Sequence, residues 1–110
     1  MSVSNAAAHD ISPVVVINTF TPKAGALEEF LAVQTAALPA LAARAHGWRG
    51  TRLYRADGDK VVMVSVFATS GDVDRFVTSE AFAAHRARVQ PLLERAEPAR
   101  GELVYEAGNV

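Results

Sequence analysis

Two runs of the chain are apolar at every position, and they constrain the fold more than any other feature. Val14–Ile17 and Val61–Val64 are rich in the β-branched residues that favour strands. A strand with one face in water alternates apolar and polar residues, whereas these two runs are apolar on both faces. Each run therefore predicts a strand that is covered on both sides.

The other segments predict the order strand–helix–strand–strand–helix–strand. In chain order, we expect a strand at 14–20, a helix from 26 that ends at Gly47, strands at 50–55 and 60–68, a short and a longer helix with Ser70 and Ser79 as N-caps, and a last strand at 102–105. This order predicts an α+β, ferredoxin-like βαββαβ fold with a four-stranded antiparallel sheet. We expect residues 1–12 to form a flexible tail and residues 13–110 to form one domain.

A monomer of this fold leaves one sheet face uncovered. Two helices cover one face of a four-stranded sheet, but the apolar runs at Val14–Ile17 and Val61–Val64 require a cover on the other face as well. The simplest cover is the same face of a second copy, packed sheet on sheet. We therefore expect a homodimer that forms a dimeric α/β barrel.

Composition excludes several classes of function. The 110 residues carry a formal net charge of −1, which gives no electrostatic basis for binding nucleic acid or an anionic membrane. The chain has no cysteine, and its histidines and carboxylates lack metal-ligand spacing, so we expect no metal site. No apolar stretch is long enough to span a bilayer and no signal peptide is recognisable, so we expect a cytoplasmic protein.

Asn18 is the polar exception in the first apolar strand. It shares a strand face with Val16 and Phe20. A buried amide without partners costs about 1–3 kcal/mol. Asn18 therefore either bonds to a neighbouring core group or faces a cavity that binds something polar, and the pattern favours the cavity.

Polar and aromatic residues on other apolar faces complete the set of candidates. His85 lies on the buried stripe of the second long helix, where it is either a structural residue or a proton carrier, because its ordinary pKa is near neutrality. The remaining candidates are core residues by default and pocket residues if a cavity exists. They are Phe20, Gln34, Met63, Ser65, Phe67 and Phe82.

From Pro13 to Tyr105 the chain resembles the antibiotic biosynthesis monooxygenase family of the dimeric α/β-barrel superfamily. No single motif is diagnostic, but their order and spacing together are fairly specific. The matching segments are Val16–Phe20, Pro22–Gly25, Glu29–Phe30, His46–Trp48 and Ser79–His85.

The resemblance implies a function as well as a fold. In that family the asparagine of the first strand and the histidine of the second helix commonly line the pocket, which points to Asn18 and His85 as catalytic residues. Some members oxidise anthrone-like polyketides to quinones with O2 as co-substrate and no cofactor. Asn18 would then donate to the developing enolate oxygen, His85 would accept or relay the proton, and Phe20 and Phe67 would stack on the rings.

Other activities of the family remain alternatives. A polyketide cyclase or isomerase would need the base and the donor but no O2. A non-catalytic dimer that binds haem or another small ligand would need neither. Phe67 stands where several members of the family carry tryptophan, which weighs against haem cleavage. Our first hypothesis is therefore a cofactor-independent monooxygenase acting on a polycyclic aromatic compound.

Overall fold

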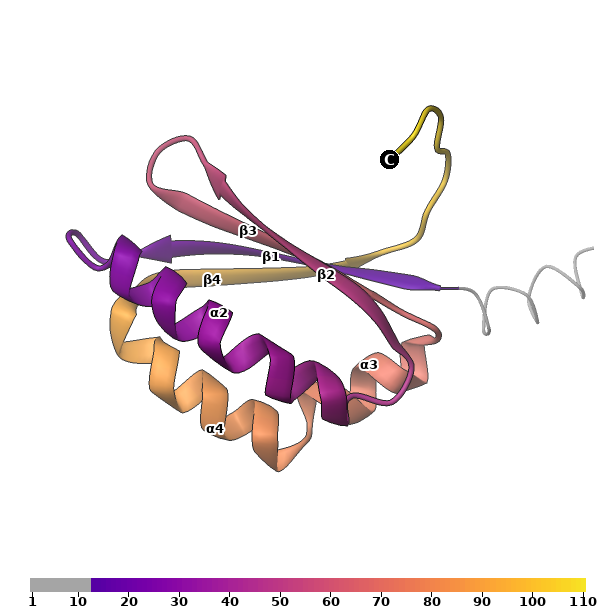
Figure 1. Cartoon of the computed structure of the whole chain (residues 1–110), viewed down its shortest axis with the longest axis horizontal. Helices are drawn as coiled ribbons and strands as arrows, with labels where there is room; N and C mark the ends of the chain where they lie inside the picture. The colour runs from indigo at the N-terminus through magenta and orange to yellow at the C-terminus, as the bar shows by residue number, and fades with distance from the viewer. Residues whose placement is uncertain (1–12) are drawn as a thin grey trace, which may run out of the picture.

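The computed structural model describes residues 13–110, so the tail expected at 1–12 lies outside the described residues. A four-stranded antiparallel sheet carries all its helices on one face (Figure 1). The elements are β1 (Val14–Pro22), α2 (Leu27–Arg44), β2 (Trp48–Ala56), β3 (Lys60–Phe67), α3 (Ser70–Val77), α4 (Glu80–Val89), a 3-10 turn η1 (Gln90–Leu92) and β4 (Leu93–Gly101). The expected ferredoxin-like α+β order is confirmed.

The strand order is β2-β3-β1-β4, so the two apolar strands β1 and β3 are central and adjacent. Their register places Asn18 opposite Met63 and Phe20 opposite Val61. Partners in an antiparallel pair share a face. Buried Phe20 and Val61 pack with Phe30 of α2 and Val89 of α4, so this face is the one covered by the helices.

One of the two predicted helix N-caps differs from the structure. Ser79 caps α4 as expected, because its hydroxyl accepts from the N–H of Phe82 at 3.2 Å. Ser70, however, is the first residue of α3, and Thr69 is the cap, since its hydroxyl accepts from the N–H of Asp72 at 3.1 Å. Both residue types suit this position, and the extended backbone of Thr69 decides between them.

The last strand was predicted in the wrong place. We expected it at 102–105, where Leu103, Val104 and Tyr105 are apolar, but β4 spans Leu93–Gly101 and those three side chains are exposed. Among the described residues, β4 is an edge strand that pairs only with β1. An edge strand tolerates charged residues and proline, so Pro98 and its polar neighbours do not prevent pairing.

Within residues 13–110, no element covers the sheet face opposite the helices, and this face is largely apolar on the central strands. On the central strands it carries Val15, Ile17, Val62, Val64 and Val66, whose partners in the register place them together. Ile17 is 38% exposed. The apolar residues that predicted a cover on this second face therefore do lie on it. Separately, no helix between residues 13 and 110 has the length and apolar character needed to cross a bilayer.

Candidate functional site

Asn18 lies in the middle of the helix-covered face of the sheet. Its neighbours across the strands are Met63 on β3 and Pro98 on β4. Proline offers no polar side chain, and within residues 13–110 the Asn18 amide makes no side-chain hydrogen bond. Asn18 is only half-buried. The amide is therefore available to a bound molecule.

A chain of polar contacts leads from Met63, the neighbour of Asn18 on β3, through α2 to α4. The Nε2 of Gln34 on α2 donates to the Sδ of Met63 at 3.3 Å. The Oε1 of the same amide lies 2.7 Å from Nε2 of His85 on α4. Gln34 is 2% exposed and His85 is 7% exposed, so this contact is protected from water. The structure thus brings together four of the predicted site residues, each from a different element. They are Asn18, Met63, Gln34 and His85.

The contact with Gln34 defines the state of the His85 ring. Because a carbonyl oxygen only accepts, Nε2 of His85 carries the hydrogen and donates it. Burial, and to a lesser degree the positive charge of Arg88, lowers the pKa of His85 below its ordinary value. The ring is therefore neutral at pH 7, and Nδ1 is left as an acceptor. Nδ1 is buried and has no partner within the described residues.

The predicted aromatic residues fall into two separate groups. Phe20 packs on Phe30 with ring centroids 5.0 Å apart. Phe67 packs on Phe76 at 5.5 Å, and Phe76 packs on Phe82 at 5.0 Å. Phe67 pairs with Val14, six residues from Phe20 on β1, which corresponds to about 20 Å along a strand. One bound ring system can therefore stack on one group but not on both.

Ser65 already has a partner that sequence reasoning did not identify. Its hydroxyl lies 2.9 Å from that of Thr51 on β2, and Thr51 accepts from the indole N–H of Trp48 at 2.9 Å. The register of β2 against β3 creates this chain of contacts, and it includes a shift between Trp48 and Gly50. No periodicity in the sequence reveals such a shift.

Asp72 is a buried polar residue that was not among the candidates predicted from the sequence. Its carboxylate accepts from Nδ1 of His46 at 2.7 Å, from Arg75 at 2.7 Å and from the hydroxyl of Thr69 at 3.0 Å. The bonds from His46 and Arg75 hold the pKa of the Asp72 carboxyl well below its usual range. His46 lies in the loop before β2, and Thr69 lies in the loop after β3. Their bonds to Asp72 therefore hold these two loops together.

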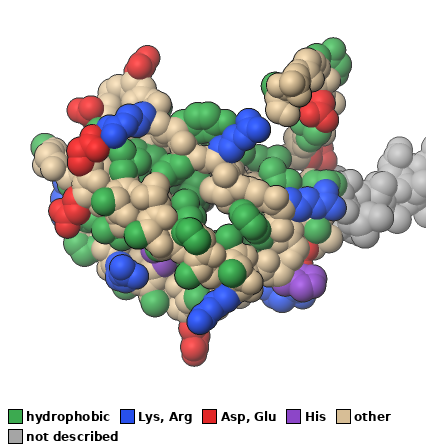
Figure 2. All heavy atoms as spheres, in the orientation of Figure 1, with side chains coloured by type: hydrophobic (Ala, Val, Ile, Leu, Met, Phe, Trp, Pro, Cys, Tyr) green, Lys and Arg blue, Asp and Glu red, His purple; other side chains and the backbone are tan. Residues whose placement is uncertain are grey.

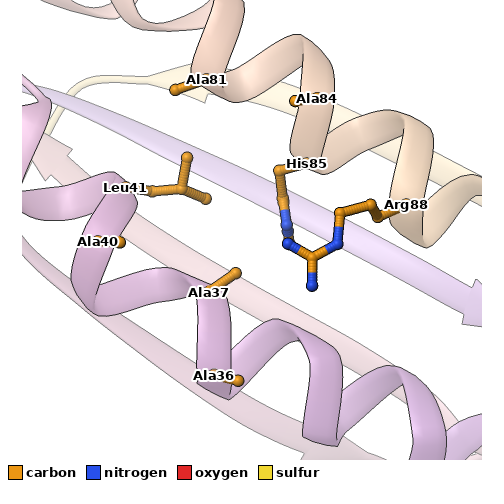
Figure 3. A pocket seen from close by; sticks show the side chains of 8 residues that line it. All are labelled: Ala36, Ala37, Ala40, Leu41, Ala81, Ala84, His85 and Arg88. Carbon is orange, nitrogen blue, oxygen red and sulfur yellow. The ribbon is translucent and has the colours of Figure 1, made fainter.

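The described part of the chain has two openings beside its helices. Figure 2 shows a gap through the molecule between the sheet and the helices, bordered by hydrophobic side chains. A second hollow of about 260 Å³ lies between α2 and α4. Among the predicted site residues, only His85 lines this second hollow (Figure 3). Within residues 13–110, no group of three histidine or carboxylate side chains is placed to hold a metal ion.

Comparison with known proteins identifies a family. The sequence model described as antibiotic biosynthesis monooxygenase matches residues 13–88. Rv0793 of Mycobacterium tuberculosis is 27% identical, with a TM-score of 0.75 over 88% of this chain and 100% of that one. No protein in a comparison with curated proteins is similar enough to count as a relative.

Two further structures share the fold at lower identity. SnoaB of Streptomyces nogalater, a cofactor-independent oxygenase, is 24% identical, with a TM-score of 0.79 over 89% of this chain and 99% of that one. A candidate antibiotic biosynthesis monooxygenase from Caulobacter crescentus is 14% identical, with a TM-score of 0.78 over 93% of this chain and 99% of that one. These likenesses support the fold.

Proposed function

The chain belongs to the antibiotic biosynthesis monooxygenase family, and on this premise we propose that it oxidises a polycyclic, anthrone-like aromatic compound to a quinone with O2. The proposed reaction uses neither metal nor flavin. The observation that carries the proposal is the half-buried Asn18 amide, which has no side-chain hydrogen bond within the described residues and lies on the apolar, helix-covered face of the sheet. A polar group in that position is consistent with a bound oxygen atom.

The chemistry explains why a cofactor is unnecessary. Removal of a proton from the methylene of an anthrone gives a carbanion that is delocalised as an extended enolate. This anion passes one electron to O2, and the two radicals combine to form a peroxide at the same carbon. Loss of water then leaves the quinone carbonyl, so one oxygen atom enters the product and the other leaves as water.

Asn18 is the proposed donor to the enolate oxygen. Its amide needs no rearrangement to donate, because no described side-chain partner has to be displaced. A fixed donor of this kind in a water-poor site contributes about 2.7–4 kcal/mol to transition-state stabilisation. Met63 and one of the two phenylalanine groups would then contact the apolar rings.

His85 is the proposed proton acceptor, and Gln34 controls which nitrogen accepts. In the resting structure, Gln34 occupies Nε2 of His85. For Nε2 to accept a proton from the substrate, the carbonyl of Gln34 must turn away and the ring hydrogen must move to Nδ1. Nδ1 has no partner within the described residues, so the one hydrogen bond that the exchange breaks is the bond between Nε2 and Gln34.

We also propose that the open sheet face pairs with the same face of a second copy. The central strands present five apolar side chains there, and Tyr54 on β2 adds a sixth that is 46% exposed. A contiguous apolar face of this kind is typical of an interaction surface. A face-to-face homodimer would cover both copies at once.

Oxygen uptake tests the function. With an anthrone and a chelator present, the unaltered protein should consume O2 and form the quinone, and Asn18→Ala should lower kcat about 100- to 1000-fold. Thr19→Val is the matched control, because Thr19 lies on the same strand but pairs with Val62 and Glu97 on the other face. An unchanged rate in Asn18→Ala removes the amide from the mechanism. Equal turnover without O2 contradicts the oxygenase and favours a cyclase or isomerase.

A further inference from the structure

The hollow between α2 and α4 exists because alanines line both helices. Ala36, Ala37 and Ala40 come from α2, and Ala81 and Ala84 come from α4. These methyl groups, drawn in Figure 3, are too small to fill the space between the two helices. A volume of about 260 Å³ remains open to solvent. Ligand pockets for drug-sized molecules measure about 300–1,000 Å³, so this hollow suits a molecule built on one ring.

One buried polar group in this hollow lacks a partner. His85 lines the hollow, is 7% exposed, and has no hydrogen bond at Nδ1 within the described residues. Because Gln34 accepts the hydrogen of Nε2, Nδ1 carries a lone pair and requires a donor. The two nitrogens lie on different sides of the ring, so Nδ1 faces away from Gln34. A ligand that satisfies Nδ1 must carry a hydroxyl or an N–H.

A positive charge lies beside this acceptor. Arg88 lines the same hollow one helical turn from His85, and its side chain turns back toward the histidine (Figure 3). No carboxylate in the described part of the chain forms an ion pair with Arg88. A guanidinium binds a carboxylate through two parallel hydrogen bonds. The hollow therefore combines apolar walls, one acceptor and one cation.

We propose that the hollow between α2 and α4 is a binding site for a small aromatic hydroxy acid. The ring lies against the alanine methyl groups, and the carboxylate pairs with Arg88. Nδ1 of His85 is buried in the free protein, so the imidazole turns toward the hollow to accept from the hydroxyl. This site is separate from the interior position of Asn18, because Gln34 lies between His85 and Met63 and neither Asn18 nor Met63 lines the hollow. Binding here does not require that the oxygenase proposal be correct.

The test is a titration of the full chain with 3-hydroxybenzoate at pH 7, followed by calorimetry and by the ¹⁵N shifts of the histidine side chains. We expect saturable binding with a change at Nδ1 of His85. Benzoate, which lacks the hydroxyl, should bind about 2- to 10-fold more weakly, as expected for one hydrogen bond. Neutral 3-hydroxybenzamide should also bind more weakly, because Arg88 then has no charge to pair with.

Substitutions locate the site. Arg88→Gln should weaken binding at least about 10-fold, as expected for a lost charge-assisted pair. Ala84→Leu should abolish binding by filling the hollow, and its circular dichroism should stay unchanged because Ala84 is exposed on the helix. Arg44→Gln, on α2 outside the hollow, is the control and should bind normally. The proposal is overturned if the unaltered protein does not bind the probe, if Ala84→Leu binds it equally well, or if only Asn18→Ala alters the affinity.

Discussion

The hydrogen bond between Gln34 and His85 allows a quantitative prediction of stability. Gln34→Leu removes the carbonyl that accepts from Nε2 of His85 at 2.7 Å and leaves that N–H buried. An unpaired buried donor costs about 1–3 kcal/mol. In a domain of this size, each 1 kcal/mol lowers Tm by about 4–8 °C. With a cost near the middle of that range, about 2 kcal/mol, Tm should fall by about 8–16 °C.

Removing both partners should cost less than the two single changes suggest. His85→Leu leaves the carbonyl of Gln34 unpaired, so it carries a similar penalty of about 1–3 kcal/mol. The double variant has neither polar group in the apolar interior. Its loss of stability should therefore be smaller than the sum of the single losses by about 1–3 kcal/mol.

The assay is urea unfolding of the unaltered protein, the two single variants and the double variant. All are measured at one protein concentration, because self-association would otherwise change the apparent stability. Gln90→Leu is the control, since Gln90 is exposed, and it should change the free energy of unfolding by less than about 0.5 kcal/mol. Strictly additive losses in the double variant would refute the coupling of Gln34 to His85. A loss in Gln34→Leu no larger than in the control would refute it as well.

Three other properties can be checked with simple measurements. Gly47→Ala should lower Tm more than Gly25→Ala: both residues have positive φ, which costs an L-residue about 1–2 kcal/mol, but only at Gly47 would the new Cβ collide with Asp72; equal losses contradict this. The folded-state pKa of His85 is lowered, so in mildly acidic solution the unfolded chain binds a proton that the folded chain does not. The free energy of unfolding should therefore fall as pH drops below about 6.5, and it should fall less in His85→Leu. Equal pH dependence in the two proteins contradicts this. Light scattering should show the unaltered protein and Ile17→Val as the proposed dimer and Ile17→Arg as a monomer; a dimer that survives Ile17→Arg contradicts the proposed interface.

The sequence predicts most of the fold because local signals and burial agree. The runs at Val14–Ile17 and Val61–Val64 identify the two central strands, and the helical period and turn residues place the elements between them. β4 was missed because an edge strand needs no apolar period and is defined by its pairing with β1. The apolar residues at 103–105 misled the prediction, since exposed side chains there have no strand partner in the described chain.

For the site, the sequence predicts faces better than distances. Parity along the first strand correctly groups Asn18 with Val16 and Phe20, and the register places this group opposite Met63, Ser65 and Val61. Parity does not give the register, so Phe20 and Phe67 were expected at one pocket although the pairing separates them. The bond from Gln34 to His85 was equally hidden, because it joins two helices whose relative position depends on packing.

His85 links the two proposed sites through the single hydrogen of its neutral ring. The interior reaction needs Nε2 as an acceptor, which requires the hydrogen on Nδ1. A hydroxy acid between α2 and α4 needs Nδ1 as the acceptor and so keeps the hydrogen on Nε2, where Gln34 already accepts it. The two demands are incompatible, because a neutral imidazole accepts at one nitrogen at a time. Saturating 3-hydroxybenzoate should therefore slow O2 uptake with an anthrone, benzoate should slow it less, and Ala84→Leu should be insensitive to both. A rate that is unaffected by 3-hydroxybenzoate when calorimetry shows the site to be full would mean that His85 does not accept the substrate proton at Nε2.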